Sequence, residues 1–118
     1  MKIKTSELED EALDFAVAQF VNPDLTPRYY QWFCLPDGNP DEIWRPSEKW
    51  SQGGPLIDER IERIDTVRDG KEERYIATTG GWPMGESRGK TILIAAMRAI
   101  VASEKGKEVE VPDELLST

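Results

Sequence analysis

At 118 residues, with 38% hydrophobic and 32% charged residues, the chain has the size and composition of one ordinary globular domain, which we expect to span residues 1–118. Its formal net charge of −8 argues against a protein that grips nucleic-acid phosphates, and its lack of histidine excludes Ser-His-Asp triads, Cys-His pairs and histidine-ligated zinc. Cys34 is the only cysteine, so no intramolecular disulfide can form, and we expect a cytoplasmic protein with neither a signal peptide nor a membrane span.

The N-terminal segment is acidic and predicts the first helix. Ser6 and Glu9 have the spacing of a capping box, and apolar residues then recur at helical intervals, so we expect a helix from Glu7 to Val21. Residues 2–5 before it are compatible with a short edge strand. We interpret the carboxylates crowded here as a solvated helix face: Glu7, Glu9, Asp10, Glu11 and Asp14.

The middle of the chain combines aromatic residues with glycine and proline. Residues 29–35 are dense in aromatic side chains and are bounded by prolines, which favours a strand with Cys34 buried. Residues 50–56, Trp-Ser-Gln-Gly-Gly-Pro-Leu, predict a built loop, because the glycines supply unusual backbone angles and Pro55 can open a helix behind them. The chain contains four tryptophans, and we expect at least one of them to be exposed.

Residues 56–67 allow two interpretations. Isoleucines at helical spacing favour a helix, whereas Asp69-Gly70 between residues 61–68 and 74–79 is typical of a hairpin turn. We prefer a short helical turn followed by the hairpin.

The last third of the chain carries the clearest helix. Residues 80–89 are rich in glycine and contain Trp82 and Met84, which predicts a long mobile loop of the kind that collects binding residues. Thr91 then caps a helix from Ile92 to Glu104 with one apolar face.

A short strand near residues 109–111 and a helical turn from Asp113 complete the predicted elements. The whole pattern predicts an α+β fold, in which two main helices pack on a small, mostly antiparallel sheet with long loops rich in glycine and proline.

Three patterns resemble functional sites, but none of them matches such a site in full. Residues 85–91, Gly-Glu-Ser-Arg-Gly-Lys-Thr, are one residue short of a phosphate-binding loop. Acid pairs within residues 58–65 alternate with arginines, as on a salt-bridged surface. We therefore expect no cofactor. We also expect no metal, because Glu42 stands where a calcium loop needs glycine in the register formed by Asp37, Asn39, Asp41 and Glu48.

Three blocks of the chain, in their order and spacing, point to one known family. They comprise residues 1–8 with 12–18, residues 46–47 with 50–57, and residues 93–98 with 101–103 and 108–112. Together they resemble the NinX-like family of small tailed-phage proteins of unknown function. The chain departs from that family at residues 89–92, which read Gly-Lys-Thr-Ile in place of Gly-Pro-Thr-Pro. The resemblance implies a phage or prophage accessory protein in the cytoplasm of a bacterial host, and it brings no catalytic residues.

Charge and resemblance together favour a non-enzymatic protein that binds a host or phage protein, for example one that inhibits a host nuclease or defence complex through an acidic surface. Trp50 and Trp82, set among glycines, are the candidate anchors. An interpretation in which Trp50 simply covers the core stays open.

The alternative is a small ligand- or anion-binding domain, or a histidine-free enzyme, with a cleft between the Trp50 segment and the start of the last helix. Weak binding of single-stranded nucleic acid by aromatic stacking is a third possibility, although we expect neither nucleic acid nor a membrane as the main partner. The candidate binding residues are Trp50, Gln52, Gly53, Gly54, Pro55, Trp82, Thr91 and Arg98.

Overall fold

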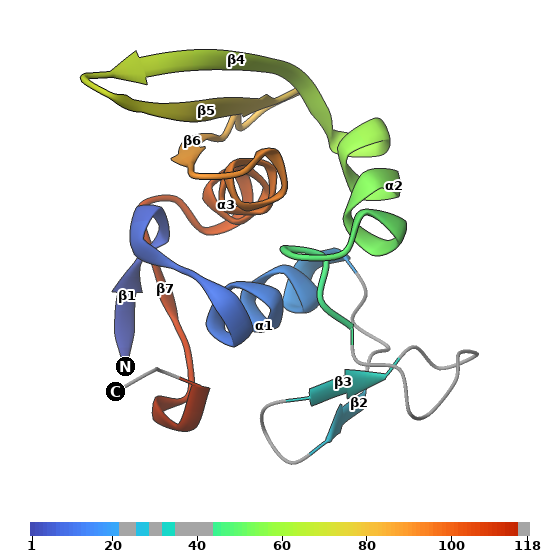
Figure 1. Cartoon of the computed structure of the whole chain (residues 1–118). Helices are drawn as coiled ribbons and strands as arrows, with labels where there is room; N and C mark the ends of the chain where they lie inside the picture. The colour runs from blue at the N-terminus through green and yellow to red at the C-terminus, as the bar shows by residue number, and fades with distance from the viewer. Residues whose placement is uncertain (22–25, 29–31, 35–43, 116–118) are drawn as a thin grey trace.

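The computed structural model describes residues 1–21, 26–28, 32–34 and 44–115, and these form an α+β arrangement, as predicted (Figure 1). The strands are β1 (Lys2–Lys4), β2 (Thr26–Arg28), β3 (Trp32–Cys34), β4 (Ile61–Asp69), β5 (Glu72–Thr79), β6 (Glu86–Gly89) and β7 (Glu108–Glu110). The helices are α1 (Asp10–Val21), α2 (Trp50–Arg60) and α3 (Ile92–Lys105), with 3₁₀ turns η1 (Thr5–Glu7) and η2 (Asp113–Leu115).

Helix α3 lies at the centre of the fold. It packs against the β4–β5–β6 sheet, α1 and α2, which surround it on different sides (Figure 1). Leu93, Met97 and Ile100 are at most 4% exposed, as the predicted apolar face requires. Ala95 and Ala99 are fully buried as well. The helix is enclosed on more than one side, so it needs small residues where a strand approaches it closely. The prediction of a single apolar face did not include these buried alanines.

The predicted hairpin is confirmed as β4 and β5. Gly70 in its turn has a φ of 68°, in the left-handed region that glycine adopts without strain. Strand β5 also pairs with β6, so Ile64, Ala77 and Ser87 form one row across the three strands. Ala77 and Ser87 are buried, which shows that this row faces α3 and that the alternate residues face away from it.

A second small sheet joins segments from opposite ends of the sequence. Strand β1 pairs antiparallel with β7, with Ile3 opposite Val109. The Met1 ammonium group donates to the Glu110 carboxylate at 2.7 Å beside this ladder. The predicted N-terminal edge strand, the last strand and the turn from Asp113, which is η2, are therefore all present.

Helix α1 begins at Asp10, later than the predicted start at Glu7. Residues 5–7 form η1 instead, and Leu8 is 1% exposed in the core. Asp10 has a φ of 52° where the chain enters the helix. The predicted capping box of Ser6 and Glu9 was wrong. Leu8 packs into the core with an extended backbone, so the helix starts only after Glu9.

The segment Trp50–Leu56 is helical and not a loop, which corrects the prediction. It forms the first part of α2, with Pro55 inside the helix and not at its start. A Cβ on Gly53 would lie 2.3 Å from the Pro46 carbonyl oxygen and 2.6 Å from Leu93 Cδ2. Glycine is needed here for close approach to the neighbouring chain, and not to supply a turn.

The predicted loop of residues 80–89 is shorter than expected, because residues 86–89 form β6. A Cβ on Gly85, just before this strand, would lie 2.1 Å from the Ala99 carbonyl oxygen. Gly85, Ser87 and Gly89 are all buried while the residues between them are exposed. The glycines that resemble a phosphate loop therefore belong to an extended segment lying closely on a helix.

Part of the predicted strand at residues 29–35 is present, since β3 pairs antiparallel with β2. Residues 29–31 and 35 lie outside the described residues, as does the side chain of Cys34. Asp37, Asn39 and Asp41 of the calcium-loop register also lie outside them.

Candidate interaction site

The Trp82 loop, which we define as residues 80–84 between β5 and β6, is held at both ends. The Thr79 amide donates to the Gly85 carbonyl at 2.8 Å, and the Gly85 amide donates to Thr79 Oγ at 2.8 Å. The Gly80 amide donates to the Arg60 carbonyl at the end of α2, at 3.2 Å. The sheet, α2 and the close contact of Gly85 with α3 therefore fix where this loop leaves the surface.

The loop exposes large apolar side chains at its tip. Trp82 is 92% exposed and Met84 is 58% exposed, whereas Trp44 is buried in the core at 5%. A nearly fully exposed indole gains little from folding, and exposed apolar groups of this size often mark interaction sites. The expectation of at least one exposed tryptophan is confirmed.

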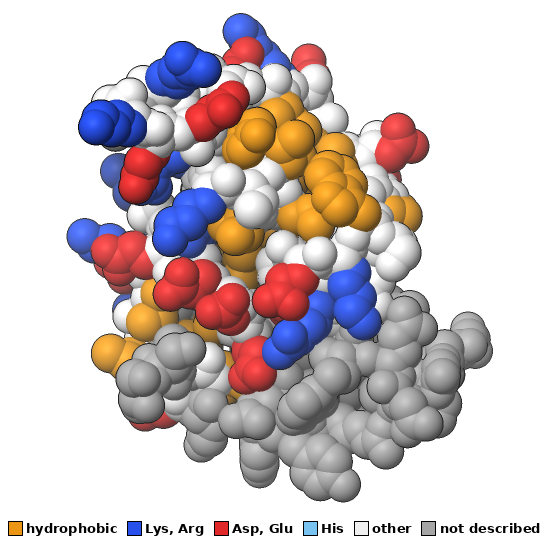
Figure 2. All heavy atoms as spheres, viewed as in Figure 1, with side chains coloured by type: hydrophobic (Ala, Val, Ile, Leu, Met, Phe, Trp, Pro, Cys, Tyr) orange, Lys and Arg blue, Asp and Glu red, His pale blue; other side chains and the backbone are white. Residues whose placement is uncertain are grey.

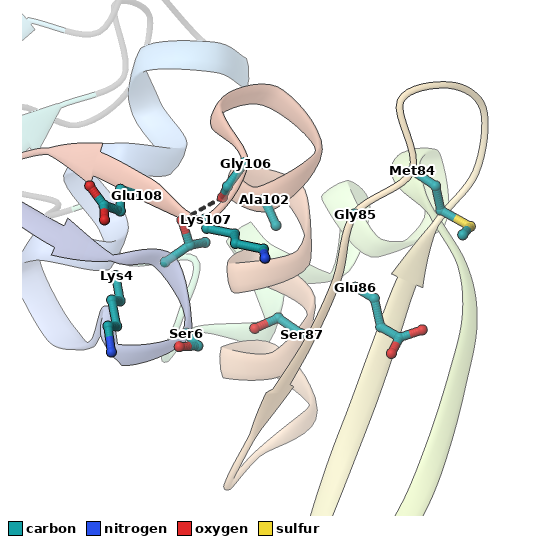
Figure 3. A pocket seen from close by; sticks show the side chains of 11 residues that line it. Lys4, Ser6, Met84, Gly85, Glu86, Ser87, Ala102, Gly106, Lys107 and Glu108 are labelled. Carbon is teal, nitrogen blue, oxygen red and sulfur yellow. Dashed lines mark hydrogen bonds between the residues drawn. The ribbon is translucent and has the colours of Figure 1, made fainter.

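Two grooves flank the Trp82 loop. The groove on the Met84 side has a volume of about 600 Å³ and lies between β6 and the β1–η1 segment, with Ala102 of α3 between them (Figure 3). Lys4 and Lys107 line the same groove. The groove on the other side has a volume of about 440 Å³ and is lined by Trp82 and by the ends of α2 and α3.

Carboxylates gather around the groove beside Trp82. Glu59 and Glu104 line it, and a Cβ on Gly80 would lie 3.2 Å from the Glu62 carboxylate. Arg60 also lines it, with its guanidinium nitrogen 3.5 Å from the Glu104 carboxylate. An exposed aromatic ring beside several carboxylates suits a partner that carries lysine or arginine.

The structure does not bring Trp50 and Trp82 together. Trp50 begins α2 and is 57% exposed, while the Trp82 loop contacts the end of the same helix. The helix has 11 residues, so its two ends are about 16 Å apart. A Cβ on Gly54 would lie 3.7 Å from the Trp50 ring, which is ordinary van der Waals contact. Pro55 is exposed on the helix.

The polar groups predicted beside Trp50 have structural partners. Gln52 Oε1 accepts from the Arg45 amide and so holds the turn before α2. Thr91 Oγ accepts from the Ile94 amide at 3.1 Å, which is the predicted cap of α3. Close packing of Gly53 on Leu93 fills the space between α2 and the start of α3 at this point. These contacts give each side chain a role in the fold.

Arg98 joins two segments of the protein. Its Nε donates to the Leu8 carbonyl at 2.7 Å, and one terminal nitrogen donates to the Arg88 carbonyl at 2.9 Å. Burial lowers the pKa of its guanidinium below the ordinary value. Arg98 therefore fastens β6 and the residue that follows η1 to the middle of α3, away from the N-terminus of the helix.

Asp14 is a buried carboxyl that the sequence placed on a solvated face, and that prediction was wrong. It is 3% exposed, and its Oδ1 accepts from the Ser47 amide at 2.9 Å. Burial raises the pKa of this carboxyl to about 7, against the opposing effect of the hydrogen bond from the Ser47 amide and the charge of Arg45. The sequence did contain a signal for this burial. The helical period of the surrounding apolar residues places position 14 beside Leu13 and Val17, near the core.

Among the described residues there is no group of three or more Cys, Asp or Glu side chains placed to hold a metal ion. No helix in the described ranges is long and apolar enough to cross a membrane. Fold and surface together define a small α+β protein with an aromatic loop raised above an acidic groove.

A family model described as "Bacteriophage P22, NinX" matches residues 4–104, so the chain belongs to the NinX family of phage proteins. This confirms the resemblance seen in the sequence. The comparison with curated proteins gives no match.

Proposed function

We propose that this phage protein is a non-enzymatic accessory protein that binds a host or phage protein through the Trp82 loop. The observation that carries the proposal is an indole that is 92% exposed on a loop held at both ends. Tryptophans that enter a pocket on a partner commonly dominate interface energies. A loop that is already held in place loses less conformational entropy when it binds.

The charge around the loop favours a basic partner surface. The whole chain carries a formal charge of −8, Glu59 and Glu104 line the groove beside Trp82, and Glu62 lies against Gly80 at the start of the loop. Such a field accelerates association with a positively charged surface and opposes acidic partners. Enzymes that act on nucleic acid carry basic surfaces, so inhibition of a host nuclease or defence complex is the form of this function that we propose.

Affinity capture from infected and uninfected bacterial lysate, read by mass spectrometry, tests the proposal. Trp82→Ala is the test variant, and Trp50→Ala is its matched control because Trp50 is the other exposed tryptophan of the described chain. We expect a partner that the native protein and Trp50→Ala retain and that Trp82→Ala loses. Loss with Trp50→Ala alone, or no partner from either lysate, would contradict the proposal.

Direct titration of the purified partner then measures the electrostatic contribution. Glu59→Gln with Glu104→Gln should weaken binding, and the native affinity should fall as salt rises. Affinity that is independent of salt would argue against the acidic groove as part of the site.

A further inference from the structure

Strand β4 is an edge of the main sheet. The strand order is β4–β5–β6, so β4 and β6 both lie at edges, but β4 has nine residues and β6 has four. In Figure 1, β4 forms the upper boundary of the molecule, with no described element beyond it. A long edge strand presents main-chain amides and carbonyls that can pair with another strand.

The surface next to this edge is apolar. Figure 2 shows hydrophobic side chains gathered over the region between β4, α2 and α3. Partly buried isoleucines lie on these elements, at Ile57, Ile61, Ile64 and Ile94. Ile64 is opposite the fully buried Ala77, so it lies on the sheet face that covers α3. A strand added at β4 would extend this apolar surface.

The opposite face of β4 is charged in an alternating pattern. Arg63 and Asp65 flank Ile64 and form an ion pair at 2.8 Å, with side chains 73% and 45% exposed. Residues of opposite charge that face each other across two neighbouring strands stabilise an antiparallel pair, and residues of like charge destabilise it. The order Arg-Ile-Asp therefore limits which strand can pair with β4, and in which register.

This order is complementary to itself. When two identical antiparallel strands meet on a two-fold axis, the residue on the axis faces its own copy. The residue before it then faces the residue after it on the other strand. With Ile64 on the axis, each Arg63 faces Asp65 of the partner subunit, and the two Ile64 side chains meet. With Asp65 on the axis, two carboxylates face each other. With Thr66 on the axis, Ile64 faces a charged residue, Arg68 of the partner subunit.

We propose that β4 pairs antiparallel with β4 of a second copy of this chain, with the two-fold axis at Ile64. The pairing joins two three-stranded sheets into one continuous sheet and brings the two apolar surfaces side by side. It does not depend on the Trp82 loop or on the proposed function.

Sedimentation velocity over a dilution series tests the pairing. Native protein should show a reversible monomer–dimer equilibrium. Arg63→Asp or Asp65→Arg alone should weaken the dimer by about tenfold or more, because each places two like-charged pairs across the axis. The double variant Arg63→Asp with Asp65→Arg should restore it, because the opposite charges again face each other.

Arg88→Asp is the matched control, because Arg88 lies in the same row of the sheet as Asp65 but on the opposite edge strand. It should leave the dimer unchanged. A chain that is monomeric at every concentration overturns the proposal. So does a dimer that survives both single reversals, or one that the double variant fails to restore. Circular dichroism and thermal melting of each variant establish that it is folded.

Disulfide crosslinking tests the register independently. In a Cys34→Ser background, Ile64→Cys should crosslink to its own copy under mild oxidation, because residues on the axis have Cα atoms within disulfide range. Thr66→Cys lies on the same face, but its two copies would be about 13 Å apart along the strands, and it should not crosslink. Equal crosslinking of the two variants, or none at Ile64→Cys, overturns the register.

Discussion

The buried carboxyl of Asp14 should make the stability of this protein fall as pH rises towards neutrality. Burial raises the pKa of this group from 3.8 to about 7 in the folded chain. Between these values the folded chain holds a proton that the unfolded chain has released, so the free energy of unfolding decreases with pH and levels off above about pH 7. A carboxylate whose pKa is lowered by folding behaves in the opposite way.

The size of the effect follows from the shift in pKa. One unit corresponds to about 1.4 kcal/mol, so ionisation of Asp14 should cost the folded state about 2.5 kcal/mol more at pH 8 than at pH 5. Asp14→Asn keeps an oxygen that can accept from the Ser47 amide but carries no charge at any pH. The variant should therefore gain stability relative to the native protein by about this amount over the same interval.

Urea unfolding of both proteins at pH 5 and pH 8 measures this difference. Taking the variant minus the native protein cancels the contributions of the other carboxylates, provided that they titrate alike in the two chains. A difference that does not change with pH would refute the reasoning, because it would mean that Asp14 is as well hydrated in the folded chain as in the unfolded one. A variant that loses stability between pH 5 and pH 8 relative to the native protein would refute its sign.

Three further predictions concern α3 and the exposed loop. Gly85→Ala should lower the free energy of unfolding in urea by about 3 kcal/mol, because its Cβ would lie 2.1 Å from the Ala99 carbonyl oxygen. Gly80→Ala, which meets only the Glu62 side chain, should cost under about 1 kcal/mol, and similar losses would contradict the close contact. Thr91→Ala should cost about 1 kcal/mol and Thr91→Ser much less; equal losses would argue against the cap. Trp82→Ala should change the free energy of unfolding by less than about 0.5 kcal/mol, and a larger loss would show that the indole packs on the protein.

Much of the local structure was predictable because local patterns reflect local forces. The apolar period of residues 92–104 and the threonine before it predict α3 and its cap, and Asp69-Gly70 predicts the hairpin turn. The family was also readable from three short blocks of residues. These features depend on neighbours along the chain, so a single sequence contains them.

The glycines show where such reasoning fails. Gly53 and Gly85 were both interpreted as parts of loops, since glycine is most often selected for its backbone freedom. In the structure each permits close contact with a segment distant in sequence, the Pro46 turn with Leu93 in one case and α3 in the other. Pattern alone does not distinguish the two uses of glycine.

The candidate site divides in the same way. The sequence by itself determined that tryptophans and glycines occur together at residues 50–54 and 80–85, that the chain is acidic, and that histidine chemistry is excluded. Only the tertiary structure decided that Trp82 stands in solvent beside carboxylates from α2 and α3, that Arg98 is engaged in holding the fold, and that Asp14 is buried. Exposure and charge environment depend on which distant segments meet, and that is a property of the packed chain as a whole.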